Sequence, residues 1–237
     1  SPERIAPVSP HYGDCGGCSL QHWAAGPYLD WKQEQVRLAL ARERIETEIE
    51  ATVAVPPGTR RRLALHARRT EDGRVVLGFK ARKSWRLVEV TACPVADPRL
   101  VAAFPALARV ADAFLEHPKS APTLHVTATL TGLDVDVTGV ERRSGGLSGD
   151  AQMQAIAAAA EVGLARLSLA GEVLMMERQP KVAFGPATVP LPPGGFLQAV
   201  PEAEAAMVAR AVEAVRGAKK IADLFCGAGT FTFPLAT

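Results

Sequence analysis

The sequence predicts an α+β central domain followed by the first βα unit of a Rossmann-like α/β domain. Two consecutive strand–strand–helix runs in the middle of the chain indicate the central domain. Near the end, a short apolar run over residues 221–225 breaks at Gly227 and Gly229 and then becomes apolar again. This pattern is typical of a strand, a glycine turn and the start of a helix, which together bring backbone N–H groups to a nucleotide-like ligand.

Composition and charge limit the class of protein. A chain of 237 residues suffices for one large or two small domains, and a hydrophobic content of 48% allows a sizeable core. No run of about 18 uncharged apolar residues is present, so we expect no membrane span. No apolar region follows the first residues, so no signal peptide is expected. We therefore expect a cytoplasmic monomer whose four cysteines are metal ligands or free thiols rather than disulfides.

Residues 1–26 are predicted to form a cysteine-containing loop, because they show little hydrophobic periodicity and many prolines and glycines. Cys15 and Cys18 form a C-x-x-C pair, whose spacing lets both sulfurs face one metal ion or cluster. A thioredoxin-type redox pair would require a βαβ unit around it, and the pattern of one is absent. Two free thiols in a turn are the alternative.

Residues 27–188 are predicted to form the central α+β domain, which we expect to bury the first helix and to hold Met175 and Met176 in its core. Apolar periodicity predicts a helix from Gly26 to about Glu46. The other expected elements are three strands within residues 59–90, a helix over 97–117, two strands within 123–140, a flexible loop over 144–149, a helix over 151–169 and a strand over 172–178.

The first two of these strands form a hairpin within a basic stretch. From Arg60 to Arg86 ten lysines and arginines stand against two acids, although the whole chain has a formal net charge of only +2. A local basic block in a nearly neutral chain is typical of a phosphate-binding face, on which Trp85 would stack on a base. The alternative is a solvated face without a ligand.

The last predicted unit covers residues 189–237. Its proline- and glycine-rich start, residues 189–195, is expected to be an interdomain linker, and Pro201 is expected to begin a helix. In the glycine turn, a dinucleotide fingerprint would require glycine at position 232, where Thr232 stands. This argues against NAD or FAD and leaves S-adenosylmethionine. Asp223 lies in the apolar run and needs a partner if it is buried.

Three stretches resemble, in the same order, the RNA uracil-C5 methyltransferases, which make 5-methyluridine. They are C-G-G-C-S-L-Q-H from Cys15, G-F-L-Q-A from Gly195 and D-L-F-C-G-A-G-T-F-T-F-P-L-A from Asp223. The resemblance runs from about Ser9 to the last residue and implies a start of an S-adenosylmethionine-dependent methyltransferase domain. It also implies that this chain is incomplete at both ends, because the family's nucleophilic cysteine and general-base glutamate would lie beyond Thr237. No catalytic residue is therefore expected here.

The resemblance implies a [4Fe-4S] cluster held by Cys15, Cys18 and Cys93, the last in a C-P-x-x-x-P-x-L context. The family's first cluster cysteine is replaced here by Ser9, and a serine oxygen is a poorer ligand for such a cluster than a thiolate. Three outcomes are open: Ser9 binds nevertheless, the cluster has three cysteine ligands and is labile, or no cluster binds.

The resemblance also implies cofactor and substrate contacts. The cofactor-binding residues would be Gln198, Phe225, Gly227 and Thr230, and the RNA-binding residues would be Arg60, Arg61, Arg62, Lys80 and Arg82. The predicted function is part of an enzyme that forms 5-methyluridine in ribosomal or transfer RNA. The alternatives are a non-catalytic RNA-binding module with a structural metal or cluster site, and a methyltransferase that acts on protein or small molecules.

Overall fold

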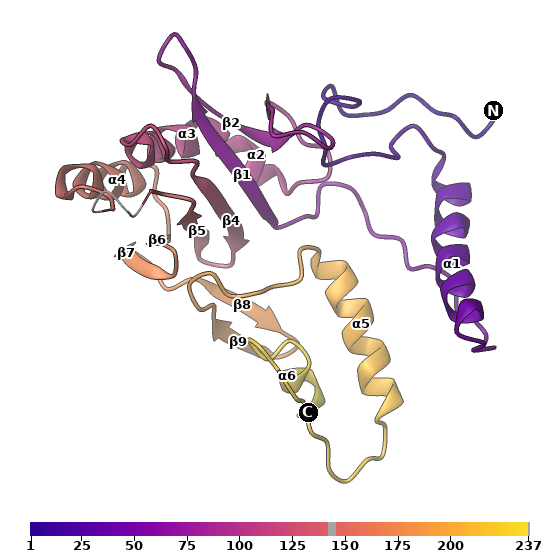
Figure 1. The fold of residues 1–237 in the computed structure, drawn as a ribbon. Helices are drawn as coiled ribbons and strands as arrows, with labels where there is room; N and C mark the ends of the chain where they lie inside the picture. Colours follow the sequence, from indigo (N-terminus) through magenta and orange to yellow (C-terminus); the bar gives the residue numbers. More distant parts are fainter. Residues whose placement is uncertain (142–145, 237) are drawn as a thin grey trace.

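A seven-stranded sheet forms the centre of the structure, a computed structural model that describes residues 1–141 and 146–236 (Figure 1). The strands lie in the order β3-β2-β1-β4-β5-β6-β7, and all neighbours are antiparallel except β5 and β6. They are β1 (Arg62–Arg69), β2 (Val75–Lys80), β3 (Leu87–Glu89), β4 (Thr123–Thr129), β5 (Gly132–Thr138), β6 (Arg166–Leu169) and β7 (Glu172–Met176). The α+β class predicted for the central part is confirmed. The loop predicted over residues 144–149 lies partly outside the described residues.

One face of the sheet is apolar and packs against helices. These are α2 (Pro98–Ala102), α3 (Phe104–Asp112), the 3-10 helix η1 (Ala113–Leu115) and α4 (Gly149–Glu161). Along β1 the alternate residues Leu63, Leu65 and Ala67 are buried in this core, because successive side chains of a strand point to opposite faces. Leu107 and Phe114 meet them from the helices and are fully buried. Each such side chain stabilises the fold by about 1.5–3 kcal/mol through its removal from water.

The opposite face of the sheet is polar. The strand register places on it side chains from five strands: Arg62, His66 and Arg68 of β1, Lys80 of β2, His125 and Thr127 of β4, Asp134 and Asp136 of β5, and Arg166 and Ser168 of β6. The chain after β9 covers the β5–β6 part of this face, where Arg166 Nη1 donates to the carbonyl oxygen of Leu191 at 2.9 Å. The part formed by β1 and β2 carries the positive side chains that reach the surface, Arg62, Arg68 and Lys80.

A smaller unit follows the sheet. It consists of the hairpin β8 (Lys181–Phe184) and β9 (Ala187–Pro190), then α5 (Pro201–Ala214) and α6 (Thr232–Leu235). Its own core is formed by Val182, Phe184, Leu191 and Leu197. The stretch predicted as a linker, residues 189–195, therefore begins inside β9 and contributes a buried leucine. The hairpin was missed because its four-residue strands lie among prolines and glycines.

The predicted strand over residues 221–225 is wrong: these residues form no strand, although a short α6 follows the glycine turn. Leu224 is 78% exposed and the Phe225 side chain is fully exposed. A strand needs a neighbour to accept its N–H groups and to cover its side chains. Within residues 1–141 and 146–236 no segment pairs with this run. The predicted βα unit is thus present only as its turn and its first helical residues.

The helix predicted over residues 151–169 is also too long. It ends at Glu161, and Gly163 with a φ of +68° allows the left-handed turn that stops it. Residues 166–169 then form β6, parallel to β5. The helix predicted over 97–117 is divided instead: α2 ends at Ala102 and α3 begins at Phe104, with Pro105 in its first turn, where proline is tolerated. Met176, expected in the core, is half exposed on β7.

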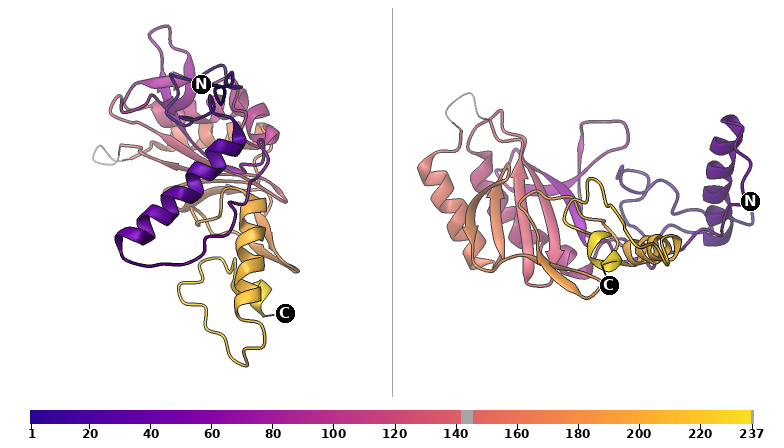
Figure 2. Two further views of the ribbon diagram at one scale, coloured as in Figure 1. Left: turned by 90° about the vertical axis from the view of Figure 1, so that its right-hand side faces the viewer. Right: turned by 90° about the horizontal axis from the view of Figure 1, so that it is seen from below.

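The first helix, α1 (Ala25–Arg42), begins one residue before the predicted start and ends at Arg42 rather than near Glu46, and the expectation that the central domain buries it is wrong. It has no buried residue and stands apart from the sheet, at the opposite end of the molecule from α4 (Figures 1 and 2). Its contacts include Trp31 with Trp23 of the preceding loop and Gln33 Nε2 with the carbonyl oxygen of Ile49. None of the described helices combines the length and the apolar character that crossing a bilayer requires.

Candidate functional site

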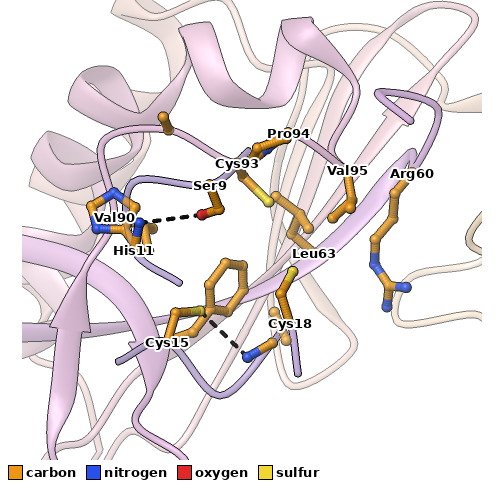
Figure 3. A pocket seen from close by; sticks show the side chains of 14 residues that line it. Ser9, His11, Cys15, Cys18, Arg60, Leu63, Val90, Cys93, Pro94 and Val95 are labelled. Carbon is orange, nitrogen blue, oxygen red and sulfur yellow. Dashed lines mark hydrogen bonds between the residues drawn. The ribbon is translucent and has the colours of Figure 1, made fainter. Parts of the chain in front are cut away.

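Three cysteines from distant parts of the sequence line one pocket (Figure 3). Cys15 and Cys18 come from the N-terminal loop and Cys93 from the segment after β3, and the sulfurs of Cys18 and Cys93 point toward one another. Ser9 lines the same pocket, which has a volume of about 310 Å³. Burial, followed by smaller contributions from the neighbouring thiols, raises the pKa of the Cys18 thiol.

Close backbone contacts hold the cysteine loop against the sheet. Gly16 N–H donates to the carbonyl oxygen of Lys80 at 3.0 Å. A Cβ atom on Gly16 would lie 2.6 Å from that oxygen, so only glycine allows this approach. His11 accepts a hydrogen bond from the N–H group of Thr91 at 3.1 Å through its Nε2 atom. The loop therefore takes its position from the edge of the sheet rather than from a core of its own.

The pocket offers three thiols and one hydroxyl to a ligand. Thiolates hold zinc ions and iron–sulfur clusters. Among the residues that the structure describes, no three His, Cys, Asp or Glu side chains converge closely enough for a single metal ion. A cluster has several iron atoms, so its ligands need not converge on one point. The three thiols are thus donors of the type that such clusters accept, and the Ser9 hydroxyl lines the same pocket.

Arg61 joins the sheet to the segment around Gln198. Its backbone N–H donates to the carbonyl oxygen of Ala199 at 2.8 Å, and its side-chain Nε donates to the carbonyl oxygen of Gln198 at 3.0 Å. Its Nη2 atom forms an ion pair of 2.8 Å with Glu204 in the first turn of α5. The Arg61 side chain is only 11% exposed, so the structure does not support its predicted contact with RNA. Sequence could not show this, because the partners lie more than 130 residues away.

The glycine turn remains open to solvent. Phe225 and Gly227 both have positive φ angles, of 59° and 58°, and nothing lies within 4 Å of a Cβ atom built on Gly227. Thr230 lines a cavity of about 490 Å³ together with Arg61 and Glu204. The carbonyl oxygen of Gln198 accepts a hydrogen bond from Arg61, a residue that lines this cavity. Of the four predicted cofactor residues, Thr230 alone lines this hollow; Gln198 only contacts its wall at Arg61, and Phe225 and Gly227 lie at the surface.

Asp223 has found a partner: it accepts a hydrogen bond of 2.5 Å from Thr232 Oγ1 across the turn. Thr232, which stands where a dinucleotide fingerprint would require glycine, thus closes the turn through its hydroxyl group. Gly229 lies directly against Phe233, whose ring would be 2.5 Å from a Cβ atom at position 229. Both contacts hold the turn to the start of α6.

The basic residues occupy several environments. Arg60 is exposed at the side of the thiol pocket, and Arg82 is exposed in the loop after β2. Arg62 lies on the polar face of the sheet with its guanidinium carbon 6.0 Å from the Phe196 ring. Lys80 Nζ lies 3.9 Å from the centre of the Trp85 ring. Four of the five predicted RNA-binding side chains are therefore at least partly accessible.

Sequence analysis missed three residues of this polar face. His66 and His125 form hydrogen bonds to Thr123 and Thr138, and burial is the main reason why the pKa values of both imidazoles are lowered. Phe196 is 73% exposed beside Arg62. The alternation along β1 indicated that His66 shares a face with Arg62. No local signal placed His125 or Phe196 there, because the pairing of distant strands decides it.

Comparison with known proteins agrees with these features, although no protein-family model matches the chain. Over 237 residues the chain is 65% identical to an uncharacterized RNA methyltransferase of Caulobacter vibrioides; this covers all of the chain and 57% of that protein. Along its whole length the chain is therefore similar to part of a protein named an RNA methyltransferase.

More particularly, the predicted resemblance to the RNA uracil-C5 methyltransferases is confirmed. The chain is 32% identical over 255 residues to the 23S rRNA (uracil(1939)-C(5))-methyltransferase RlmD of Halomonas elongata, covering 52% of that protein. It has the fold of part of the Pyrococcus abyssi tRNA (uracil-54, C5)-methyltransferase solved with S-adenosyl-L-homocysteine, with a TM-score of 0.66, 21% identity and coverage of 98% of this chain and 56% of that one. The chain thus spans little more than half the length of these proteins.

Proposed function

We propose that the chain is part of an S-adenosylmethionine-dependent enzyme that forms 5-methyluridine in ribosomal RNA. The observation that carries this proposal is the 32% identity, along the entire chain, to a protein named for uracil-C5 methylation of 23S rRNA. The 65% identity to an RNA methyltransferase supports the same reaction class. A cytoplasmic location and a monomeric state remain predictions.

In this proposal the glycine turn and the Gln198 segment bind the cofactor. S-adenosylmethionine would supply an electrophilic methyl group, and Gln198, Phe225, Gly227 and Thr230 would hold it. The open space at Gly227, the exposed Phe225 ring and the hollow at Thr230 are consistent with a ligand that lies along this turn. Arg61 would orient the segment through its bond to the Gln198 carbonyl oxygen.

The polar face of β1 and β2 is the proposed RNA-binding surface. Arg60, Arg62, Lys80 and Arg82 would contact phosphates, which fix the position of RNA without reading its sequence. Arg61 is not included, because its guanidinium is occupied by Glu204. The acids of the same face do not compete, since Asp134 is paired with Arg166 and Asp136 accepts a hydrogen bond from the N–H group of Gly171.

For the thiol pocket we propose an iron–sulfur cluster with Cys15, Cys18 and Cys93 as ligands and Ser9 at the fourth position. Such a cluster would fix the N-terminal loop to the sheet, which that loop contacts through few apolar side chains. Anaerobically purified protein is expected to contain iron and sulfide, and Cys18→Ser to lose them. Ser9→Cys is expected to slow cluster loss in air, because it adds a fourth thiolate. Cys226→Ser, at an exposed site, is the matched control. Iron-free wild-type protein would overturn this assignment.

The proposed activity is tested on the full-length protein. Incubation with labelled S-adenosylmethionine and transcripts of 23S rRNA fragments is expected to yield 5-methyluridine, identified by mass spectrometry of the nucleosides. Transfer RNA transcripts serve as the comparison substrate, and their exclusive methylation would overturn the ribosomal assignment. If the protein binds RNA but neither binds S-adenosylmethionine nor transfers a methyl group, it is a non-catalytic RNA-binding module instead.

A further inference from the structure

A second hollow lies at the other end of the polar face, away from the Gln198 segment. It has a volume of about 340 Å³ and is formed by β1, β2, β3, the loop between β2 and β3, and the chain before β4. Its lining residues include His66 and Arg68 of β1, Lys80 of β2, Leu87 of β3, Trp85 of the loop and Pro122. No residue assigned to the cofactor or to the cysteine pocket belongs to it.

The chemistry of this hollow is that of a site for an anion with a flat ring. Two of its lining residues, Arg68 and Lys80, are cationic, and no aspartate or glutamate lines it. Leu87, Leu115 and Pro122 supply apolar surface, and Trp85 supplies an aromatic wall. Nucleic-acid-binding proteins combine these features, because bases stack on aromatic rings while cations contact the phosphates.

Trp85 is held in position before any ligand binds. Its side chain is 86% exposed, which is unusual for so large an apolar group, and Lys80 Nζ lies 3.9 Å from its ring centre. The loop that carries it is closed by hydrogen bonds from Ala81 N–H to the Arg86 carbonyl oxygen, at 2.8 Å, and from Ser84 N–H to the Ala81 carbonyl oxygen, at 3.1 Å. An ion pair between Arg86 and Asp14 ties the same loop to the N-terminal segment.

We propose that this hollow binds one unstacked nucleotide of the RNA substrate, with its base on Trp85 and its phosphate at Arg68 and Lys80. The inference rests on the proposed function, because it names a second contact of the same RNA. The bound nucleotide is not the one that is methylated. Arg68 lies six residues from Arg62 along β1, about 20 Å at the rise of an extended strand, and Arg62 is the residue of this face beside Phe196 and the Gln198 segment.

The charge pattern favours RNA over a protein as the occupant. An acidic peptide would also satisfy Arg68 and Lys80, but a nucleotide carries an anion and a flat ring in one unit, which matches these two cations beside the exposed face of Trp85. His66 lies in the same hollow with its Nδ1 atom 2.9 Å from Thr123 Oγ1, so its other ring nitrogen is available to hydrogen-bond the edge of a base. A base with polar edges, rather than a purely apolar ring, fits this arrangement.

The test uses the full-length protein and single-stranded fragments of the RNA that it methylates. Trp85→Ala is expected to weaken RNA binding about tenfold or more, because stacking of one base on an aromatic ring contributes that much. Trp85→Phe is expected to restore most of the affinity, and binding of S-adenosylmethionine is expected to be unchanged in both. Bound RNA is also expected to quench the fluorescence of Trp85, measured as the difference in quenching between the wild type and Trp85→Phe.

A matched pair of arginine variants tests the phosphate contact. Arg68→Gln is expected to weaken RNA binding several-fold, whereas Arg109→Gln, the same change on α3 at the helical side of the molecule, is expected to have no effect. Unchanged RNA affinity in Trp85→Ala would overturn the inference, and displacement of the RNA signal by a poly-glutamate peptide with equal strength would identify the hollow as a peptide site. If the wild-type protein methylates no RNA, the proposed function fails instead.

Discussion

The central sheet and the closing segment, residues 216–236, differ in where their apolar side chains find partners. Leu65, Leu107, Phe114 and Val126 of the sheet and its helices are fully buried within this chain. In the closing segment Leu224 is 78% exposed and Phe225 completely so, and only Gly229 and Pro234 are buried. The same apolar character therefore gives a strand in one region and an uncovered turn in the other. A strand pattern specifies structure only when neighbouring strands are available to pair with it.

The largest expected effect separates the two regions directly. Phe114→Ala is expected to lower the free energy of unfolding by about 3–5 kcal/mol, because it leaves a cavity in a closely packed core. Phe225→Ala removes a side chain of the same size that is already in water. It is expected to change the free energy of unfolding by less than about 0.5 kcal/mol. Urea unfolding of both variants measures the difference. Equal losses would show that the closing segment is packed in solution.

A slightly smaller loss of folding stability is expected when the buried ion pair of the polar face is broken. Arg166 donates two hydrogen bonds of 2.8 Å to Asp134, and their side chains are 2% and 6% exposed. Asp134→Asn is expected to cost about 3 kcal/mol, because it leaves the guanidinium buried without an opposite charge. Asp112→Asn breaks the exposed pair with Arg69 and is the matched control, with an expected cost below about 1 kcal/mol. Chemical denaturation compares them; equal costs would contradict the prediction.

A smaller loss of stability again is expected when the contact between the sheet and α5 is weakened. Glu204→Gln is expected to cost about 1–3 kcal/mol, because one hydrogen bond to Arg61 can remain while the charge pairing is lost. Glu213→Gln, at an exposed position of the same helix, is the control. Amide hydrogen exchange should show faster exchange at the start of α5 in Glu204→Gln alone. Unchanged protection there would show that Arg61 does not hold the segment.

The smallest effect concerns pH. Burial lowers the pKa values of His66 and His125 in the folded protein, so both imidazoles bind protons more readily in the unfolded chain. Stability should therefore decrease as the pH falls below about 6.5, the ordinary pKa of histidine. The double variant His66→Gln and His125→Gln should reduce this slope, measured by urea unfolding between pH 7 and about pH 5. A slope identical to that of the wild type would contradict the prediction.

The sequence by itself determined the local features. Alternation predicted β1 and β2 with their hairpin turn, apolar periodicity predicted the first helix to within a few residues, and Pro201 predicted the start of α5. The three ordered motifs indicated the resemblance to the RNA uracil-C5 methyltransferases, because such motifs depend on residue types at short spacing. Gly163 was a local stop signal for α4 that the alanine periodicity concealed.

The tertiary structure alone decided which of these features meet. It brought Cys93 to Cys15 and Cys18, and it turned Arg61 from a candidate RNA contact into the partner of Glu204, 143 residues away. It also placed His125 beside β1 and left residues 221–225 without a neighbouring strand. The physical reason is that burial, ion pairing and strand pairing depend on residues far apart in the chain, whereas periodicity and turn signals depend only on adjacent ones.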